Sequence, residues 1–170
     1  MGVAHVHVWD ERLYRRRARS SRVVKLRPAT LNDASMLLAW RNDLNTRLAS
    51  KNVGLVDEAT HARWLDERLR DPKDHLYIAM EDDAPVGVGR IQDAEVSLTI
   101  SPTLRGRGYA RELIFYLCEQ ARELGMKELT ATVFTTNRFS LLAFIHEEFE
   151  LAAIDSDATR SWVTLRRDLA

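Results

Sequence analysis

The sequence is poor in cysteine, balanced in charge and free of long apolar runs, and each feature excludes a class of protein. A single cysteine, Cys118, among 170 residues excludes an internal disulfide framework, and its apolar surroundings predict a buried thiol. No run reaches the roughly 18 apolar residues of a membrane-spanning helix, and charges interrupt the N-terminus where a signal peptide has its apolar core. We therefore expect a soluble protein that works in a reducing cytoplasm.

The formal net charge of zero conceals a basic N-terminal segment. Residues 1–27 contain eight Lys and Arg against two acidic residues, so the remainder of the chain is acidic. We interpret residues 1–22 as a basic extension ahead of one domain spanning 23–170. A basic segment can also bind nucleic acid or an acidic partner. His5 and His7 are, by themselves, a weak signal for a metal site.

Hydrophobic periodicity predicts a sheet interleaved with helices, in the order β-α-α-β-β-β-α-β-α-β-β. Strict alternation over 94–100 places Val96, Leu98 and Ile100 on one face of a strand. Six of the seven expected strands are assigned to 23–27, 75–80, 85–92, 94–100, 127–134 and 161–169. The expected helices begin near Leu31 and after Asp57 and cover 110–124 and 137–149.

Residues 104–114, "LRGRGYARELI", enter a helix directly after a strand. The first turn of a helix has backbone N–H groups without intrahelical partners, and the helix dipole adds partial positive charge there. Gly106 and Gly108 remove the side chains that would keep an anion away from these amides, while Arg105 and Arg107 add formal charge. The segment therefore predicts a cradle for a pyrophosphate.

Two other phosphate-binding motifs do not fit this segment. A P-loop requires Lys and then Ser or Thr after its last glycine, whereas Gly108 is followed by Tyr109 and Ala110. The dinucleotide fingerprint requires a third small residue, where this chain has Arg111. The remaining pattern, R-x-x-G-x-A from Arg105 to Ala110, resembles the acetyl-CoA pyrophosphate loop of the GCN5-related N-acetyltransferases (GNAT).

A second motif strengthens the resemblance. In that family a later helix carries an Asn, a small residue and an aromatic residue, and this chain has Asn137, Ser140, Phe144 and Phe149 at matching spacing. The resemblance covers roughly 23–168. It implies a single-domain α/β (α+β) fold with a mixed, mostly antiparallel central sheet, a splayed cofactor strand and helices on both faces.

The resemblance implies acetyl-CoA as the cosubstrate and assigns its contacts. The backbone of Leu98 to Ile100 would lie along the thioester, and the amides of Arg105 to Ala110 would hold the pyrophosphate. Asn137 would bond the pantetheine arm or the splayed strand, or cap its own helix. The implied cofactor-binding residues are Leu98, Ile100, Arg105, Gly106, Arg107, Gly108, Tyr109, Ala110, Asn137, Ser140 and Phe144. No metal is implied.

Two residues depart from the family pattern. Glu148 stands where the family usually has glycine, so we expect the helix to close without a left-handed glycine. Phe144 stands where many members have a tyrosine thought to protonate the departing thiolate. Its ring can pack on the pantetheine arm but cannot donate a proton. The general acid is therefore unassigned, and solvent suffices for a thiolate of modest pKa.

An ammonium acceptor must lose a proton before it attacks a thioester, which suits a carboxylate acting directly or through water. Glu95 begins the cofactor strand on its polar face and is our candidate catalytic base. The alternative is an ordinary solvated side chain at a strand edge.

The segment ahead of the cofactor loop shapes the acceptor site in this family. The stretch "AWRNDLNTR" is typical of the branch that contains ribosomal-protein N-terminal and nucleotide-amino-sugar N-acetyltransferases. We expect Trp40, Arg41, Asn42 and Arg47 to border the acceptor. The alternative is a helix end with Trp40 in the core and solvated charges. Phosphates of a sugar nucleotide would pair with Arg41, Arg47 or Lys51, which favours an amino-sugar nucleotide.

Other functions stay open at this stage. A peptide N-terminus is the alternative acceptor, and a non-catalytic acyl-CoA-binding module is the alternative to an enzyme, favoured by Phe144 and opposed by Glu95. A nucleic-acid-binding protein ranks last because the chain after residue 27 is acidic. The sequence leaves the oligomeric state open, with a homodimer as one option.

Overall fold

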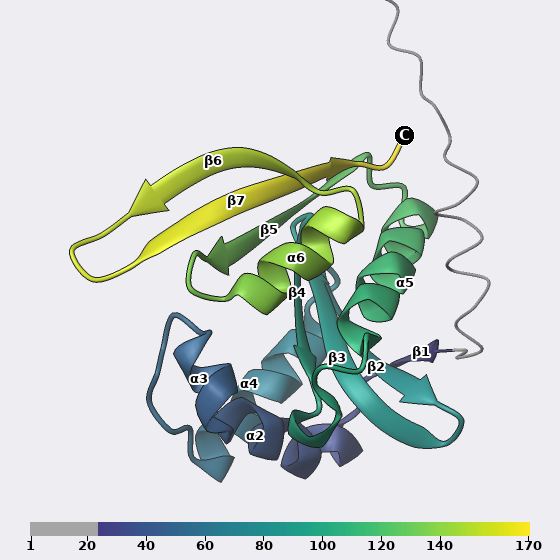
Figure 1. Cartoon of the computed structure of the whole chain (residues 1–170). Helices are drawn as coiled ribbons and strands as arrows, with labels where there is room; N and C mark the ends of the chain where they lie inside the picture. The colour runs from purple at the N-terminus through teal and green to yellow at the C-terminus, as the bar shows by residue number, and fades with distance from the viewer. Residues whose placement is uncertain (1–23) are drawn as a thin grey trace, which may run out of the picture.

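A computed structural model describes residues 24–170 (Figure 1). The basic extension at 1–22, its two histidines and the strand residue Val23 lie outside the described residues, so the expectations for them stay predictions. The helices are α2 (Ala34–Asn42), α3 (Leu44–Leu48), α4 (Glu58–Arg70), α5 (Tyr109–Glu123) and α6 (Arg138–His146), with 3-10 helices η1 (Leu31–Asp33) and η2 (Pro102–Leu104). The strands are β1 (Val24–Pro28), β2 (Asp74–Glu81), β3 (Ala84–Gln92), β4 (Glu95–Ile100), β5 (Glu128–Phe134), β6 (Glu150–Ser156) and β7 (Ser161–Asp168).

The strands form one sheet in the order β1-β2-β3-β4-β5-β7-β6. All neighbours are antiparallel except β4 and β5, which run parallel because α5 carries the chain back between them. The expectation of a mixed, mostly antiparallel sheet is confirmed.

Helices α5 and α6 cover one face of the sheet (Figure 1). The apolar side of α5 is completely buried at Leu113, Leu117 and Cys118, so the thiol lies in the core as predicted. Glycine in β3 permits this close packing, since a Cβ atom on Gly89 would lie 2.5 Å from Leu117 Cδ1. The sheet therefore holds α5 with its N-terminus just beyond the end of β4.

Helices α2 and α4 pack on the other face (Figure 1). Trp40 of α2 and Leu65 of α4 are buried there with Ile78 of β2, while Trp64 and Leu69 are partly buried at the margin. Helices thus cover both faces, as expected.

One helix ends earlier than expected from the sequence, and another is followed by a separate short helix. The helix expected over 137–149 stops at His146, and Glu148 itself adopts the left-handed conformation with φ 64°, which is uncommon for a residue with a side chain. Helix α2 ends at Asn42, and the Asp43 carboxylate accepts a hydrogen bond from the Thr46 amide (3.1 Å) to start the separate short helix α3.

Within residues 24–170, no helix has both the length and the apolar character needed to cross a membrane.

Candidate active site

Strands β4 and β5 touch at one end only. Their ladder contains the single pair Glu95 and Thr130, with the Thr130 amide donating to the Ala94 carbonyl at 2.8 Å. Beyond this pair the two strands separate (Figure 1). The splayed strand expected from the sequence is therefore present, and the sheet opens along β4.

The backbone of β4 offers free hydrogen-bonding groups to this opening. The Ser101 amide donates to the Val86 carbonyl of β3 at 2.9 Å. Because hydrogen-bonding direction alternates along an antiparallel strand, Thr99 also faces β3, whereas the N–H and C=O groups of Leu98 and Ile100 face β5. Leu98 and Ile100 have no strand partner on that side, which suits their predicted role toward an extended ligand.

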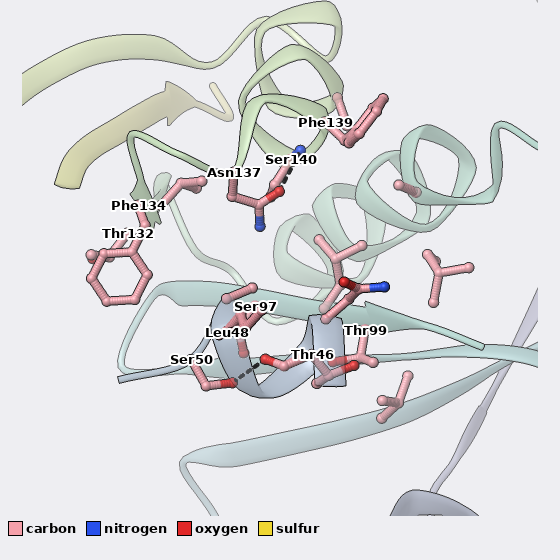
Figure 2. Close-up of a pocket in the computed structure, with 18 of the residues that line it drawn as sticks. Thr46, Leu48, Ser50, Ser97, Thr99, Thr132, Phe134, Asn137, Phe139 and Ser140 are labelled. Atoms are coloured by element: carbon pink, nitrogen blue, oxygen red, sulfur yellow. Dashed lines mark hydrogen bonds between the residues drawn. The ribbon is translucent and has the colours of Figure 1, made fainter. Parts of the chain in front are cut away.

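A cleft of about 2070 Å³ runs through the opening. Residues of α3, β4, β5, α6 and the entry to α5 line it, and Figure 2 shows the polar side chains of Thr46, Ser97 and Thr99 beside its floor. The first turn of α6, with Asn137 and Ser140, lies across the cleft from them. One continuous space thus connects the helix entry to the face of the sheet covered by α2–α4.

The loop between β4 and α5 has the backbone of an anion cradle. Gly106 and Gly108 have φ values of 75° and 90°, which side-chain-bearing residues rarely adopt, and no atom lies within 4 Å of where a Cβ would project. In the described chain, nothing accepts from the amides of Gly106, Gly108 or Ala110. Open space above unpartnered amides at a helix N-terminus fits a pyrophosphate.

The arginine side chains of this loop do not gather beside the cradle as expected. The Arg105 guanidinium turns to α3, where Nη2 donates to Asp43 Oδ1 (2.6 Å) and to Thr46 Oγ1 (2.7 Å). Arg107 is exposed and does not line the cleft. The Tyr109 ring is buried and its hydroxyl donates to Glu81, which leaves only its backbone for the cradle. The backbone is therefore the main anion-binding element.

Helix α6 contributes the predicted Asn, Ser and Phe to the cleft. Asn137 caps the helix, with Oδ1 accepting from the Ser140 amide at 3.2 Å, and its amide nitrogen points toward β4 (Figure 2). Capping and a ligand contact are thus compatible. Phe144 lines the cleft but is 2% exposed and packs edge-on against Phe149, with ring centroids 4.9 Å apart. Phe144 therefore acts as a fixed apolar wall.

Glu95 lies at the closed end of the splay. Its side chain is exposed, lines the cleft and shares a face of the sheet with Ser97 and with Gln92 opposite. This is the face that packs against α2–α4, so Glu95 borders both the cofactor strand and the predicted acceptor segment.

The predicted acceptor residues separate into two groups. Trp40 and Arg41 line the cleft, Trp40 as a buried wall. Asn42 and Arg47 do not: Asn42 exchanges hydrogen bonds with the Val56 backbone (2.8 and 2.9 Å), and Arg47 donates to the Val53 and Asn42 carbonyls (2.9 and 3.2 Å). These two residues hold the loop between α3 and α4, which forms one side of the cleft.

Known proteins with similar sequences identify the family to which this cleft belongs. The sequence profile described as the Acetyltransferase (GNAT) family matches residues 36–146, most of the described chain. The chain belongs to the GNAT family. It is therefore an acetyl-CoA-dependent N-acetyltransferase.

Relatives of this GNAT chain cover most of its length. It is 24% identical over 129 residues to the uncharacterized N-acetyltransferase YfmK of Bacillus subtilis (strain 168), covering 74% of this chain and 84% of that protein. The structure of yncA from Salmonella typhimurium with acetyl-CoA has a TM-score of 0.73 at 18% identity (87% and 95% covered). The ribosomal-protein-alanine N-acetyltransferase of Brucella melitensis has a TM-score of 0.73 at 25% identity (85% and 99% covered).

One contact beside the acetyltransferase cleft has no signal in the sequence. Arg160, in the turn between β6 and β7, donates to the Ser50 carbonyl at 2.9 Å and lies over the Phe134 ring at 5.0 Å. Ser50 in turn donates from its hydroxyl to the Thr46 carbonyl (2.7 Å) (Figure 2). Arg160 and Ser50 lie 110 positions apart in the chain, so local sequence pattern could not pair them.

Metal ligands do not gather in the part of the chain that the structure describes: it contains no group of three His, Cys, Asp or Glu residues that could hold an ion.

Proposed function

We propose that this acetyltransferase acetylates the amine of an amino-sugar nucleotide. The observation that carries the proposal is the charge of the cleft beside α2–α4. The lining residues between 37 and 64 include Arg41 and Lys51 and no Asp or Glu. An amine that carries phosphates is attracted by such a wall, whereas a polyamine is repelled.

The coenzyme half of the cleft would work through the backbone. The amides around Gly106 and Gly108 hold the pyrophosphate, and the free groups of Leu98 and Ile100 hold the arm that carries the thioester. Acetyl-CoA supplies an acetyl group activated as a thioester. N–H groups already in place beside its carbonyl favour the charge that develops there, without reorganisation during the reaction.

Glu95 would accept the proton of the acceptor ammonium. The support is positional, since Glu95 lines the cleft at the end where the cofactor strand meets the acceptor side. Besides Glu95, Asp157 is the sole carboxylate lining the cleft among the described residues, and it caps the β6–β7 turn by accepting from the Thr159 and Arg160 amides (2.7 and 2.8 Å). Glu95 is thus the carboxylate left for proton transfer.

The departing thiolate needs no dedicated acid in this account. Phe144 has no proton to give, and Tyr109 already donates to Glu81. A thiol of ordinary pKa, about 8.5, leaves as a thiolate without full protonation in the transition state. Solvent entering the open cleft completes the proton transfer.

A peptide N-terminus is the second candidate acceptor. It is favoured by the similarity, at 25% identity, to the structure named as a ribosomal-protein-alanine N-acetyltransferase. Against it stands the lack of carboxylates in the wall between 37 and 64, since a peptide N-terminus enters as a cation.

A comparison of acceptors tests the proposal. At saturating acetyl-CoA, kcat/KM is measured for a UDP-linked amino sugar, the same free amino sugar and an alanine-initiated peptide. We expect kcat/KM for the nucleotide-linked sugar to be at least about tenfold higher than for the free sugar or the peptide. This difference corresponds to one contact that recognises a phosphate. A higher kcat/KM for the peptide would replace the proposal by the second candidate, and coenzyme binding without thiol release with any of them would favour a non-catalytic module.

A further inference from the structure

One guanidinium beside the cleft, that of Arg41, is only partly satisfied. Arg41 Nη2 donates to the Asn52 carbonyl at 2.8 Å, but Arg41 Nη1 is buried and has no hydrogen-bond partner among residues 24–170. A guanidinium carries five donors, and a buried one left unsatisfied is costly. A side chain that lines the cleft therefore keeps one charged donor that no group among the described residues satisfies.

This donor lies in a defined part of the cleft, the acceptor lobe, lined by Trp40, Arg41, His61 and Trp64. His61 is 4% exposed, and its ring lies 5.3 Å from that of Trp64. Burial, together with the charge of Arg41, lowers the pKa of His61, so the imidazole is neutral at pH 7 and still has one N–H to donate. The lobe therefore combines apolar walls with two hydrogen-bond donors, one on a charged guanidinium and one on a neutral imidazole.

The lobe connects to the reacting end of the cleft through β3. The Arg90 guanidinium lies 6.0 Å from the Trp64 ring and donates to Gln92, which pairs across the strands with Glu95. A ligand group in the lobe and an amine at Glu95 therefore belong to neighbouring parts of one acceptor.

Neighbouring cations of the cleft are already neutralised. Arg90 makes two hydrogen bonds of 2.6 Å to Asp74, and Arg105 makes one of 2.6 Å to Asp43. Arg41 has no such carboxylate, and the described residues give it no ion pair. Burial lowers the pKa of Arg41, and the positive charge of Arg47 lowers it further. The lobe therefore has an uncompensated positive charge that would attract a negative group of a ligand.

We propose that the Arg41 guanidinium and His61 form a subsite for an oxyanion of the acceptor, a phosphate or a carboxylate, with Trp40 and Trp64 as its walls. The inference rests on the proposed function in that the oxyanion belongs to the amine acceptor. The subsite adds a basis for specificity, because the enzyme would select amines that also carry a negatively charged group. Low local polarity between the tryptophans strengthens the attraction to the guanidinium.

A binding experiment tests the subsite without any need for turnover. With coenzyme A saturating, so that the cradle is filled, inorganic phosphate and acetate are titrated in separate arms by calorimetry. The proteins are the wild type, Arg41→Gln and Arg63→Gln; Arg63 is an exposed cation of α4 that does not line the cleft. We expect Arg41→Gln to weaken binding of the preferred anion about tenfold or more and Arg63→Gln to leave it within twofold.

A second variant keeps the test decisive if Arg41→Gln unfolds through loss of the Asn52 contact. His61→Phe preserves the aromatic contact with Trp64 and removes the N–H donor, so we expect a loss of about threefold or more. Equal anion affinity in wild type, His61→Phe and Arg41→Gln, or no anion binding once coenzyme A is present, would overturn the subsite.

The two proposals fail in distinguishable ways. If no amino-sugar nucleotide is acetylated but anion binding depends on Arg41, the proposed acceptor is wrong and the subsite stands. If the nucleotide is acetylated with a KM that Arg41→Gln does not raise, the acceptor stands and the subsite is wrong.

Discussion

Arg105 and Asp43 form an ion pair that joins the coenzyme loop to the acceptor segment. Arg105 Nη2 lies 2.6 Å from Asp43 Oδ1, across 62 positions of the chain. Asp43 also caps α3 through the Thr46 amide. Burial raises the pKa of Asp43, but the hydrogen bonds from Arg105 and Thr46 outweigh it and keep that pKa below its usual value. One carboxylate thus ties the loop between β4 and α5 to α3, the two segments proposed to hold the coenzyme and to border the acceptor.

We predict that breaking this pair impairs both substrates. Arg105→Gln should raise KM for acetyl-CoA and for the acceptor, because the loop and α3 lose their common anchor. A double-mutant cycle with Asp43→Asn should show a coupling of about 1 kcal/mol in the free energy of unfolding, as for a partly buried pair. Strictly additive effects of the two substitutions would show that the pair is not a link.

The glycines of the cradle give a second prediction. Gly108→Ala should lower the free energy of unfolding by about 1–2 kcal/mol, because φ is 90° and an L-residue is strained there. Gly108→Asp should in addition abolish acetyl-CoA binding, since its carboxylate would lie among the phosphate-binding amides. Calorimetry and thermal unfolding measure the two effects separately.

Gly125 provides the matched control. It has φ 77° and equally open surroundings, but it follows α5 at the end remote from the cleft. Gly125→Asp should lose similar stability and retain coenzyme affinity. Equal coenzyme affinity in the Gly108 and Gly125 aspartate variants would contradict the cradle.

The third prediction concerns Glu95. Glu95→Gln should lower kcat by about 100-fold or more, without a change in the Kd of acetyl-CoA, because the amide cannot take a proton. The control is Glu128→Gln, which lies at an exposed position of β5 outside the cleft. Its kcat and its Kd for acetyl-CoA should equal those of the wild type. An unaltered pH–rate profile in the Glu95 variant would remove it as the base.

The fourth prediction concerns His61 and pH. Its folded-state pKa lies below the ordinary value of 6.5, so the unfolded chain takes up the proton first as the pH falls. The contribution of His61 to stability is therefore complete above pH 6.5 and is lost as the pH falls from there toward the folded-state pKa. Urea titrations from pH 7.5 to 5 should show this loss in the wild type and a smaller one in His61→Gln, while His146→Gln, at an exposed position, behaves like the wild type.

The parts of the molecule that depend on local pattern were predictable from sequence. Alternation over 94–100 correctly assigned the faces of β4, and the glycines at 106 and 108 correctly marked the helix entry. These features follow from steric rules that act within a few residues. The family resemblance then supplied the direction of β4 and its splay, which no local rule contains.

Features that depend on distant contacts were not predictable. Nothing near Arg105 in the sequence indicates that Asp43 takes its charge, and Arg160 meets Ser50 only because the sheet brings the β6–β7 turn to the α3–α4 loop. Asn42 and Arg47 looked like ligands because polar residues at a helix end are equally suited to solvent, substrate and loop carbonyls. Only the folded structure shows which of these partners each residue has, and the same holds for Arg41.

The central claim is that this chain transfers acetyl groups from acetyl-CoA, held between β4 and β5, to an amine at Glu95. The most direct measurement follows free coenzyme A thiol and the mass of a UDP-linked amino sugar in one reaction with purified enzyme. We predict thiol release in equal amount to acetylated sugar, at least about 100-fold slower in Glu95→Gln and absent in Gly108→Asp. Acetylation that proceeds at the wild-type rate in both variants would contradict the account.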